Sequence, residues 1–209
     1  MGLVVERFEI MANCYVLRVD DEAAEAVVVD PGGAAADVAG ELARRGVRCA
    51  AILVTHADVD HVGGVADLAE LTGAPVYAPD PALMPHIRAQ GGGFFPPPRP
   101  YEIATTVADG TAFDAAGIAF ETIGVPGHSP DHVAFLADGA LFAGDLLMEG
   151  TVGRVDFPGG DWEALLGSVA ALFDRLPPET LVYPGHGGPT TLGAERDSNP
   201  FLAELRATT

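Results

Sequence analysis

Short apolar runs alternate along this chain with stretches in which apolar residues recur at helical spacing, and glycine-rich turns separate them. Runs of about four to eight residues that are rich in valine, isoleucine and phenylalanine are typical of strands. They predict strands over residues 3–10, 14–19, 26–29, 50–54, 75–78, 118–123, 133–136, 140–143 and 180–183. The helical spacing predicts helices over residues 34–45, 62–71, 161–176 and 200–207, with Asp161 as the N-cap of the third. The pattern alone predicts a mixed α and β structure.

Possible metal ligands are concentrated in the segment that begins at residue 56, just after the apolar run at 50–54. This segment, HADVDH in one-letter code, contains four of them: His56, Asp58, Asp60 and His61. Alternate side chains of an extended chain share one side, so the first histidine and both aspartates are expected to point together, while the second histidine enters the next helix and turns elsewhere. One loop can then serve two metal ions. The alternative is that an aspartate only caps the helix, but a cap needs one carboxylate and leaves the other three groups unexplained.

Three further candidates stand in similar positions along the chain. His128, Asp145 and His186 each follow a short apolar run and are preceded closely by glycine. Glycine allows a chain that leaves a strand to turn sharply and to pass close to a site. Four of the six histidines thus lie at predicted strand ends, which indicates a common site rather than scattered surface residues.

The ordered set of Asp30, the HADVDH segment, His128, Asp145 and His186 resembles the metallo-β-lactamase superfamily, whose signature is HxHxDH followed by a distant histidine, a bridging aspartate and a last histidine. Segments 29–33, 126–130, 153–157 and 183–187 are similar to the small type II glyoxalases of that superfamily, which are hydroxyacylglutathione hydrolases. The resemblance extends over nearly the whole chain. It implies an α+β fold, the four-layer αββα sandwich, in which two sheets pack face to face with helices outside.

The same resemblance implies two metal sites that share one ligand. Site one would take His56, the residue at position 58 and His128. Site two would take Asp60, His61 and His186, and Asp145 would bridge the two ions. Asp60 and Asp145 are therefore expected to take part in catalysis as well as to bind metal.

Position 58 departs from the signature, because the family has histidine there and this chain has Asp58. A carboxylate is a harder, anionic ligand, so it shifts the preference from zinc, the first expectation for both sites, toward iron or manganese. Aspartate is also shorter than histidine, and it reaches the metal either directly or through water. These two alternatives leave the occupancy of site one open, whereas site two is unaffected.

The expected chemistry follows from the metal ions. Two divalent ions about 3.5–4 Å apart lower the pKa of a bound water to about 7 and so supply hydroxide as a nucleophile. The expected function is a metal-dependent hydrolase, and the resemblance implies an acyl thioester of glutathione or another carrier thiol as its small-molecule substrate. An iron-dependent sulfur or redox enzyme, similar to the persulfide dioxygenases, is the alternative on the same fold. The third possibility is a degenerate member of the superfamily in which site one is inactive.

A serine nucleophile is disfavoured by the local sequence. Ser129 lies beside a candidate histidine, but Pro130 follows it directly and the segment lacks the pattern of a nucleophile elbow. The nucleophile is therefore expected to come from the metal site.

Composition and charge limit the possible partners of the protein and its possible location. A net charge of −19 with 11 basic residues excludes nucleic acid as a partner and disfavours attraction to anionic membranes. No apolar run approaches the roughly 20 residues that span a bilayer, and the first residues lack the layout of a signal peptide, so we expect a cytoplasmic protein. A single domain over residues 1–209 is expected, and a homo-oligomer is an open alternative. Cys14 and Cys49 lie in apolar runs, which favours buried thiols over a disulfide.

Other residues near the motifs have weaker predicted roles. Asp30 is expected either to support the ligand loops by hydrogen bonding or only to shape the turn before Pro31. His132 is interpreted as a structural histidine with satisfied hydrogen bonds. Asp131 occupies a position where close relatives tend to have glycine or another small residue. Arg154 and Asp156 are expected to pair, His86 to lie at the surface, and segment 91–98 to form a loop over the active-site face or a rigid surface loop.

Overall fold

The computed structural model describes residues 2–83 and 96–207, and the strands in these ranges form two six-stranded sheets and one separate hairpin. The first sheet has the order β1 (Val4–Ile10), β2 (Ala12–Arg18), β3 (Glu25–Val29), β4 (Arg48–Leu53), β5 (Val76–Ala78) and β6 (Thr105–Thr106). The second has the order β14 (Thr190–Thr191), β13 (Leu181–Pro184), β10 (Ala140–Gly144), β9 (Val133–Ala137), β8 (Ile118–Gly124) and β7 (Ala112–Ala115). The hairpin joins β11 (Leu147–Met148) and β12 (Thr151–Val152).

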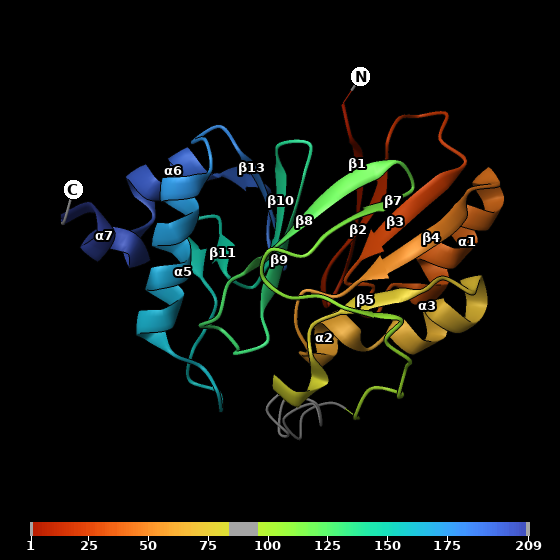
Figure 1. Cartoon of the computed structure of the whole chain (residues 1–209), viewed down its shortest axis with the longest axis horizontal. Coiled ribbons are helices and arrows are strands. Elements are labelled where there is room, and N and C mark those ends of the chain that lie inside the picture. Colours follow the sequence, from red (N-terminus) through yellow and green to blue (C-terminus); the bar gives the residue numbers. More distant parts are fainter. Residues whose placement is uncertain (1, 84–95, 208–209) are drawn as a thin grey trace.

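Helices lie on the outer sides of the two sheets (Figure 1). The first sheet is covered by α1 (Ala35–Arg45) and α3 (Val65–Thr72), and the second by α5 (Trp162–Arg175) and α6 (Leu192–Ser198). The one-turn helix α2 (Val59–Val62) precedes α3, and α7 (Ala203–Ala207) ends the described chain. Two short 3-10 helices, η1 (Pro81–Leu83) and η3 (Pro200–Leu202), complete the set that the described residues form.

Alternating side chains on the strands build the layers. Tyr15 and Leu17 of β2 point between the two sheets, where they share a cluster with Phe135 and Phe142 of the second sheet. Cys14, next to Tyr15, points the other way and packs in the cluster that contains α1 and α3. A third cluster joins the outer face of the second sheet to α5 and α6. Because strand side chains alternate between two faces, each sheet buries both of its faces, and the expected αββα sandwich is confirmed.

Parallel pairing brings several loops to one edge of each sheet. β3 pairs in parallel with β4, and β10 pairs in parallel with β13. The carboxyl ends of parallel neighbours lie at the same edge, and loops placed there by rigid strands commonly carry function. Asp30 follows β3, the HADVDH segment follows β4, Asp145 follows β10 and His186 follows β13.

Every strand predicted from the sequence is present, with ends that differ by at most two residues. The strands that were missed, β6, β7, β11, β12 and β14, have only two to four residues, which is too short to show alternation. The helix predicted at 62–71 begins three residues earlier as α2, stops, and continues from Val65 as α3. The break falls at Gly64, where a Cβ atom would overlap the carbonyl oxygen of Gly32 and lie 3.0 Å from Ala35 Cβ. Close contact with the start of α1 therefore explains the glycine and the interruption.

Three smaller predictions have clear outcomes. Asp161 caps α5, because its carboxylate accepts a hydrogen bond of 3.0 Å from Ala164 N. Cys14 and Cys49 are both buried free thiols, as expected. His86 and most of segment 91–98 lie outside the described residues. Within residues 2–83 and 96–207, no helix has the length and apolar character required to cross a bilayer.

Candidate metal centre

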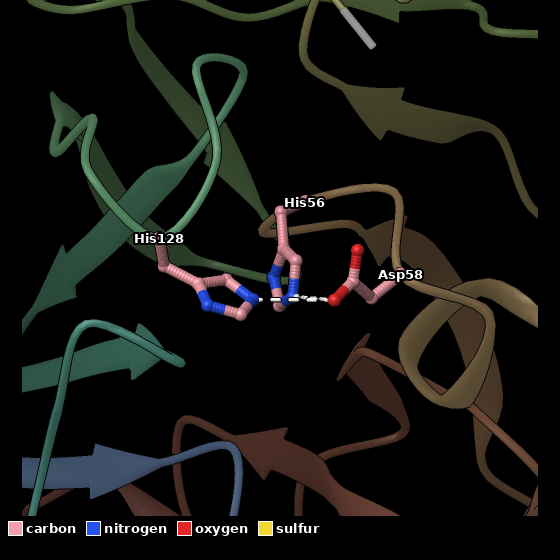
Figure 2. Close-up of side chains that lie close together, drawn as sticks. All are labelled: His56, Asp58 and His128. Carbon is pink, nitrogen blue, oxygen red and sulfur yellow. Dashed lines mark hydrogen bonds and ion pairs between the residues drawn. The ribbon is translucent and has the colours of Figure 1, made fainter. Parts of the chain in front are cut away.

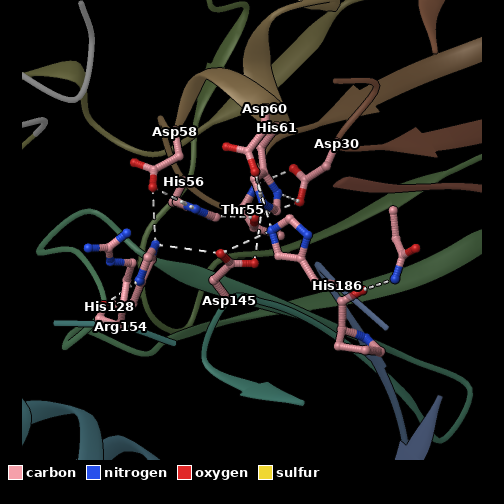
Figure 3. Close-up of polar contacts among 12 residues, drawn as sticks. Asp30, Thr55, His56, Asp58, Asp60, His61, His128, Asp145, Arg154 and His186 are labelled. Atoms are coloured by element: carbon pink, nitrogen blue, oxygen red, sulfur yellow. Dashed lines mark hydrogen bonds and ion pairs between the residues drawn. The ribbon is translucent and has the colours of Figure 1, made fainter. Parts of the chain in front are cut away.

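Seven side chains from four separate segments converge where the loops of the two sheets meet (Figure 3). They are the seven residues that the sequence identified, and they fall into three overlapping groups of possible ligands: His56 with Asp58 and His128, His56 with His61 and Asp145, and Asp60 with His61 and His186. In each group the ligand atoms lie within 4.8 Å of one another. The fold thus collects residues that are up to 130 positions apart in the sequence, from 56 to 186.

The first group has the composition expected for site one (Figure 2). Asp58 Oδ2 lies 3.2 Å from His128 Nε2 and 3.8 Å from His56 Nε2. Metal–ligand bonds of about 2.0–2.2 Å bring neighbouring ligand atoms to separations of this order. The carboxylate is therefore close enough to both imidazoles to share an ion with them directly, without an intervening water.

The group expected for site two is more open to solvent. Asp60 Oδ2 lies 3.2 Å from His186 Nε2 and 3.9 Å from His61 Nε2. The His61 side chain is fully buried, whereas that of His186 is 39% exposed. The side of the centre occupied by His186 is therefore the one that a small molecule can approach.

Asp145 lies between the two groups. Its Oδ1 atom is 3.2 Å from His61 Nε2, and its Oδ2 atom is 3.4 Å from His186 Nε2 and 3.8 Å from His128 Nε2. A single carboxylate thus faces histidines from both groups, which is the arrangement that a shared ligand requires.

The two aspartates of the HADVDH segment do not point to the same side, contrary to expectation. The extended backbone ends at Asp58, and Asp60 already lies in the helical turn of α2. Asp58 therefore faces His128, whereas Asp60 faces His186. Asp58 occupies the N-cap position of α2, but its side chain makes no capping hydrogen bond. The alternative in which it serves only as a helix cap is not supported.

Polar groups behind the site orient the three buried histidines. His61 Nδ1 lies 2.9 Å from Asp30 Oδ2, and His128 Nδ1 lies 2.7 Å from the carbonyl oxygen of Arg154. His56 Nδ1 lies 3.0 Å from Thr55 Oγ1, whose own proton goes to Asp30 Oδ2 at 2.6 Å. Each partner can only accept here, so each Nδ1 carries the ring proton of the neutral imidazole. In the metal-bound state, the Nε2 atom of each of these three rings would then direct a lone pair at the centre, as in known metal sites.

Asp30 supports two of these histidines, His61 directly and His56 through Thr55. It accepts hydrogen bonds from Thr55 N at 2.8 Å and from the Thr55 hydroxyl, in addition to its contact with His61. Its supporting role, one of two alternatives from the sequence, is the one that the contacts favour. Thr55 was missed, although a hydroxyl residue directly before the first ligand was the available signal.

The unpaired atoms at the centre fit divalent metal ions. His56 Nε2 is buried and makes no hydrogen bond to any residue of the described ranges, and the buried atoms His61 Nε2 and Asp145 Oδ1 have no hydrogen bond there beyond their own contact of 3.2 Å. Buried polar atoms are normally hydrogen-bonded, so such a cluster requires another explanation. Imidazole nitrogens and carboxylate oxygens that face a common space are the ligands that zinc, iron and manganese take.

Burial and the neighbouring carboxylates shift the pKa values of the histidines at the centre when no metal is bound. Burial lowers the pKa of His56 well below its ordinary value. Hydrogen bonds to Asp145 and Asp60 raise the pKa of His186 to about 10. Burial also opposes the charged form of His61, but Asp145 and Asp30 more than offset it, so the pKa of His61 lies well above its usual range. The metal-free protein thus holds protons where cations would otherwise lie.

Two glycines and one asparagine shape the loops around the ligands. A Cβ atom on Gly185 would overlap Asp145 Oδ1 and lie 2.6 Å from His61 Cε1. Gly153 packs equally tightly, since its Cβ atom would overlap the carbonyl oxygen of Asp145. Asn13 is buried and donates from Nδ2 to the carbonyl oxygens of Pro184 and Gly187, both at 2.9 Å. It holds the turn that carries His186, and only its polarity within an apolar run marked it in the sequence.

Three of the four residues that follow His128 are also buried: Ser129, Asp131 and His132. The prediction of a structural histidine with satisfied hydrogen bonds is wrong for His132, because neither ring nitrogen bonds to a residue of the described ranges. Its ring instead packs against that of His56, with centroids 4.6 Å apart, and burial lowers its pKa to about 3. Arg154 and Asp156 pair through two contacts of 2.6 Å, as expected.

Comparison with known proteins agrees with this geometry. The sequence model of the Metallo-beta-lactamase superfamily matches residues 7–186. The chain is 31% identical to the hydroxyacylglutathione hydrolase GloC of Haemophilus influenzae, over 91% of this chain and 92% of that protein. Among solved structures, it is similar to TTHA1623 in a di-iron-bound form, with 38% identity, a TM-score of 0.79 and coverage of 95% and 100% of the two chains. It is also similar to the BLEG-1 B3 metallo-beta-lactamase, with 33% identity, a TM-score of 0.84 and coverage of 96% of this chain and 100% of that chain.

The family match includes most of both sheets and all seven residues of the centre, up to His186. The similar solved structures share the arrangement of layers over nearly the whole chain. The protein therefore belongs to the metallo-β-lactamase superfamily.

Proposed function

We propose that this protein is a metal-dependent hydrolase that cleaves acyl thioesters. The position of Asp145 is the observation that carries the proposal. Its carboxylate faces His61 and His186 on one side and His128 on the other, so two groups of ligands can hold two ions side by side. Membership in the superfamily supports hydrolysis, and the similarity to a hydroxyacylglutathione hydrolase supports a thioester as the bond that is cleaved.

Some side chains of the centre would bind the metal ions, and others orient the imidazole rings. A pair of divalent ions supplies an activated water and polarises a carbonyl group. The three histidines that are fixed through Nδ1 would bind the ions through Nε2, and Asp145 would be the ligand that both groups share. His186 lies on the solvent side, where the substrate enters.

Water is the nucleophile in this proposal because no side chain of the described ranges is suited to attack. Ser129 lies at the site but is completely buried, and its hydroxyl has no partner in those ranges that would act as a base. Cys14 and Cys49 are buried among apolar residues, and burial raises the pKa of both thiols, which disfavours the thiolate.

The metal identity is part of the same proposal. Four imidazoles make zinc the expected metal, and the third carboxylate, from Asp58, extends the range to iron and manganese. A similar protein, TTHA1623, has been solved in a di-iron-bound form, which supports iron as the second expectation.

Hydrolysis of defined thioesters tests the function. Protein purified without chelator is assayed with the lactoyl thioesters of glutathione, coenzyme A and N-acetylcysteamine, by loss of thioester absorbance. Hydrolysis of at least one of them is expected for the wild type and is expected to be lost in Asp145→Ala. Asp109→Ala is the matched control, because Asp109 accepts a backbone hydrogen bond from Gly124 N but belongs to none of the ligand groups.

Two results would overturn the proposed function. One is the absence of hydrolysis from protein that carries two ions per chain. The other is oxygen uptake with glutathione persulfide by iron-loaded protein that leaves every thioester intact, which would establish the sulfur-oxidising alternative.

A further inference from the structure

A carboxylate outside the proposed ligand set also holds the HADVDH segment. Asp131 Oδ2 accepts a hydrogen bond of 3.0 Å from Ala57 N. Ala57 lies between the ligands His56 and Asp58, and Asp131 lies three residues after His128. The bond therefore joins the two segments that supply the proposed ligands of site one, directly between two of these ligands and three residues from the third.

This contact complements the one made by Asp30. Asp30 follows β3 of the first sheet and holds the segment through Thr55 and His61. Asp131 precedes β9 of the second sheet and holds it through Ala57. A backbone bond of 2.9 Å from Val133 N to the carbonyl oxygen of Thr55 lies beside it. The ligand segment is thus bonded to both sheets, and Asp131 supplies a side-chain bond on the side of site one.

Burial of the Asp131 carboxylate costs free energy, which its contacts must offset. Asp131 is 2% exposed, and its Oδ1 atom has no hydrogen-bond partner among the described residues. A buried carboxylate with few partners is unfavourable, and the hydrogen bond from Ala57 N offsets part of this cost.

The hydrogen bond between Asp131 and Ala57 N bears on the position of Asp58. An aspartate has a short side chain, so whether its carboxylate reaches the imidazoles depends on where the backbone at position 58 lies. The hydrogen bond at Ala57 N fixes the peptide group between His56 and Ala57, one residue before Asp58. Asp58 Oδ2 then lies 3.2 Å from His128 Nε2, as observed.

We propose that Asp131 is a positioning residue for metal site one, which it maintains by holding the Ala57 amide and with it Asp58 against His128. The inference rests on the ligand set of the proposed function. It concerns only site one, because Asp131 contacts none of the residues assigned to site two in any hydrogen bond or ion pair recorded for the described ranges.

Zinc binding to the metal-free protein tests this role independently of catalysis. Calorimetric titration with Zn²⁺ is expected to show two sites in the wild type. In Asp131→Ala, one site is expected to weaken by about 10- to 100-fold, the range found for residues that support metal ligands, while the other keeps its affinity. Asp131→Asn retains an oxygen that accepts the Ala57 hydrogen bond, and it is expected to restore binding to within about threefold of the wild type.

The control is Asp109→Ala, which removes a carboxylate that accepts the backbone hydrogen bond of Gly124 N at 2.9 Å. It is expected to bind both ions as the wild type does. If Asp131→Ala does not fold, Asp131→Glu replaces it, because the added methylene displaces the carboxylate while keeping its charge. The same selective loss is then expected.

Equal affinities in the wild type and Asp131→Ala, or equal weakening of both sites, would overturn the inference, and so would failure of Asp131→Asn to restore site one. A wild type that binds a single zinc ion would contradict the dinuclear site of the proposed function itself. That result is visible before any variant is compared, so the two failures are distinguishable.

Discussion

Asp58 Oδ2 lies 3.2 Å from His128 Nε2, although the two residues are 70 positions apart in the sequence. Asp58 belongs to the segment after β4 of the first sheet, and His128 to the connection between β8 and β9 of the second. The contact therefore spans the two sheets of the sandwich. It places a carboxylate where the superfamily signature has a histidine, and turns it toward the same space as the imidazoles.

Replacement of Asp58 by histidine is expected to change the metal at site one. Asp58→His restores a neutral nitrogen ligand, so the zinc content should rise and the iron or manganese content should fall. Elemental analysis of both proteins, expressed in the same medium and purified without chelator, measures the change. Asp67→His, at an exposed carboxylate of α3 outside the ligand groups, controls for the altered charge. Identical metal content in Asp58→His and wild type would show that Asp58 does not tune the site.

Loss of the shared ligand should abolish hydrolysis without unfolding the protein. In Asp145→Ala we expect kcat/KM to fall by more than about a hundredfold, the upper range for residues that only support the ligands. His61→Ala should behave similarly, because its ring contacts Asp145 and Asp30. The far-ultraviolet circular dichroism of both variants is expected to match the wild type. Near-normal rates in either one would rule out the dinuclear mechanism.

Two glycine-to-alanine changes should have opposite effects on stability. Gly185→Ala inserts a methyl group into contact with Asp145 and His61, so it should destabilise the protein by roughly 1–3 kcal/mol and reduce its metal content. Gly167 lies in α5, where no described residue outside the helix backbone has an atom within 4 Å of the position that an added methyl group would take. Gly167→Ala should therefore stabilise the helix by up to about 1 kcal/mol. Thermal melting and metal analysis measure both effects, and a Gly185→Ala protein with normal stability and metal content would contradict the packing around the ligands.

The metal-free protein should lose stability as the pH rises. The pKa of His186 is raised from 6.5 to about 10 by its contacts with Asp145 and Asp60. A raised pKa in the folded state gives stability that is complete below pH 6.5 and disappears as the pH rises through about 10. Melting curves of chelator-treated protein across this window should show a falling midpoint, and the fall should be smaller in His186→Gln. A midpoint that rises over the same range would contradict the assigned charges.

Metal binding should reverse this dependence. A divalent ion displaces the protons from His61 and His186, so binding releases protons and zinc affinity increases with pH. Proton release can be measured by calorimetry in buffers of different ionisation enthalpy. Zinc binding without proton release would contradict the raised pKa values of these two histidines.

Much of the fold and all seven side chains of the centre could be predicted from the sequence, because apolar runs and strand-end ligands are local patterns. The alternation argument failed at Asp60, since a helical turn begins at Val59 and changes the direction of the following side chains. Thr55 and Asn13 were missed because their roles depend on contacts with distant residues, Asp30 and the turn at Pro184. Strands of two residues, such as β14, form only because a neighbouring strand offers its edge.

The role of the carboxylate that distinguishes this centre could not be judged from the sequence either. Whether Asp58 reaches a metal directly depends on the path of the backbone, and only the structure shows its carboxylate 3.2 Å from His128 and 3.8 Å from His56. The buried bond from Ala57 N to Asp131 is equally a property of the folded chain. Both features depend on how the two sheets meet, and sequence patterns describe each sheet separately.

Anomalous diffraction from crystals of the protein, purified without chelator, tests the central claim most directly. The data are collected at the absorption edge of the metal that elemental analysis identifies. We predict two anomalous peaks about 3.5–4 Å apart, one of them bonded to His56, Asp58 and His128 and both to Asp145. A single peak held by Asp60, His61 and His186, with Asp58 turned away from it, would contradict the account.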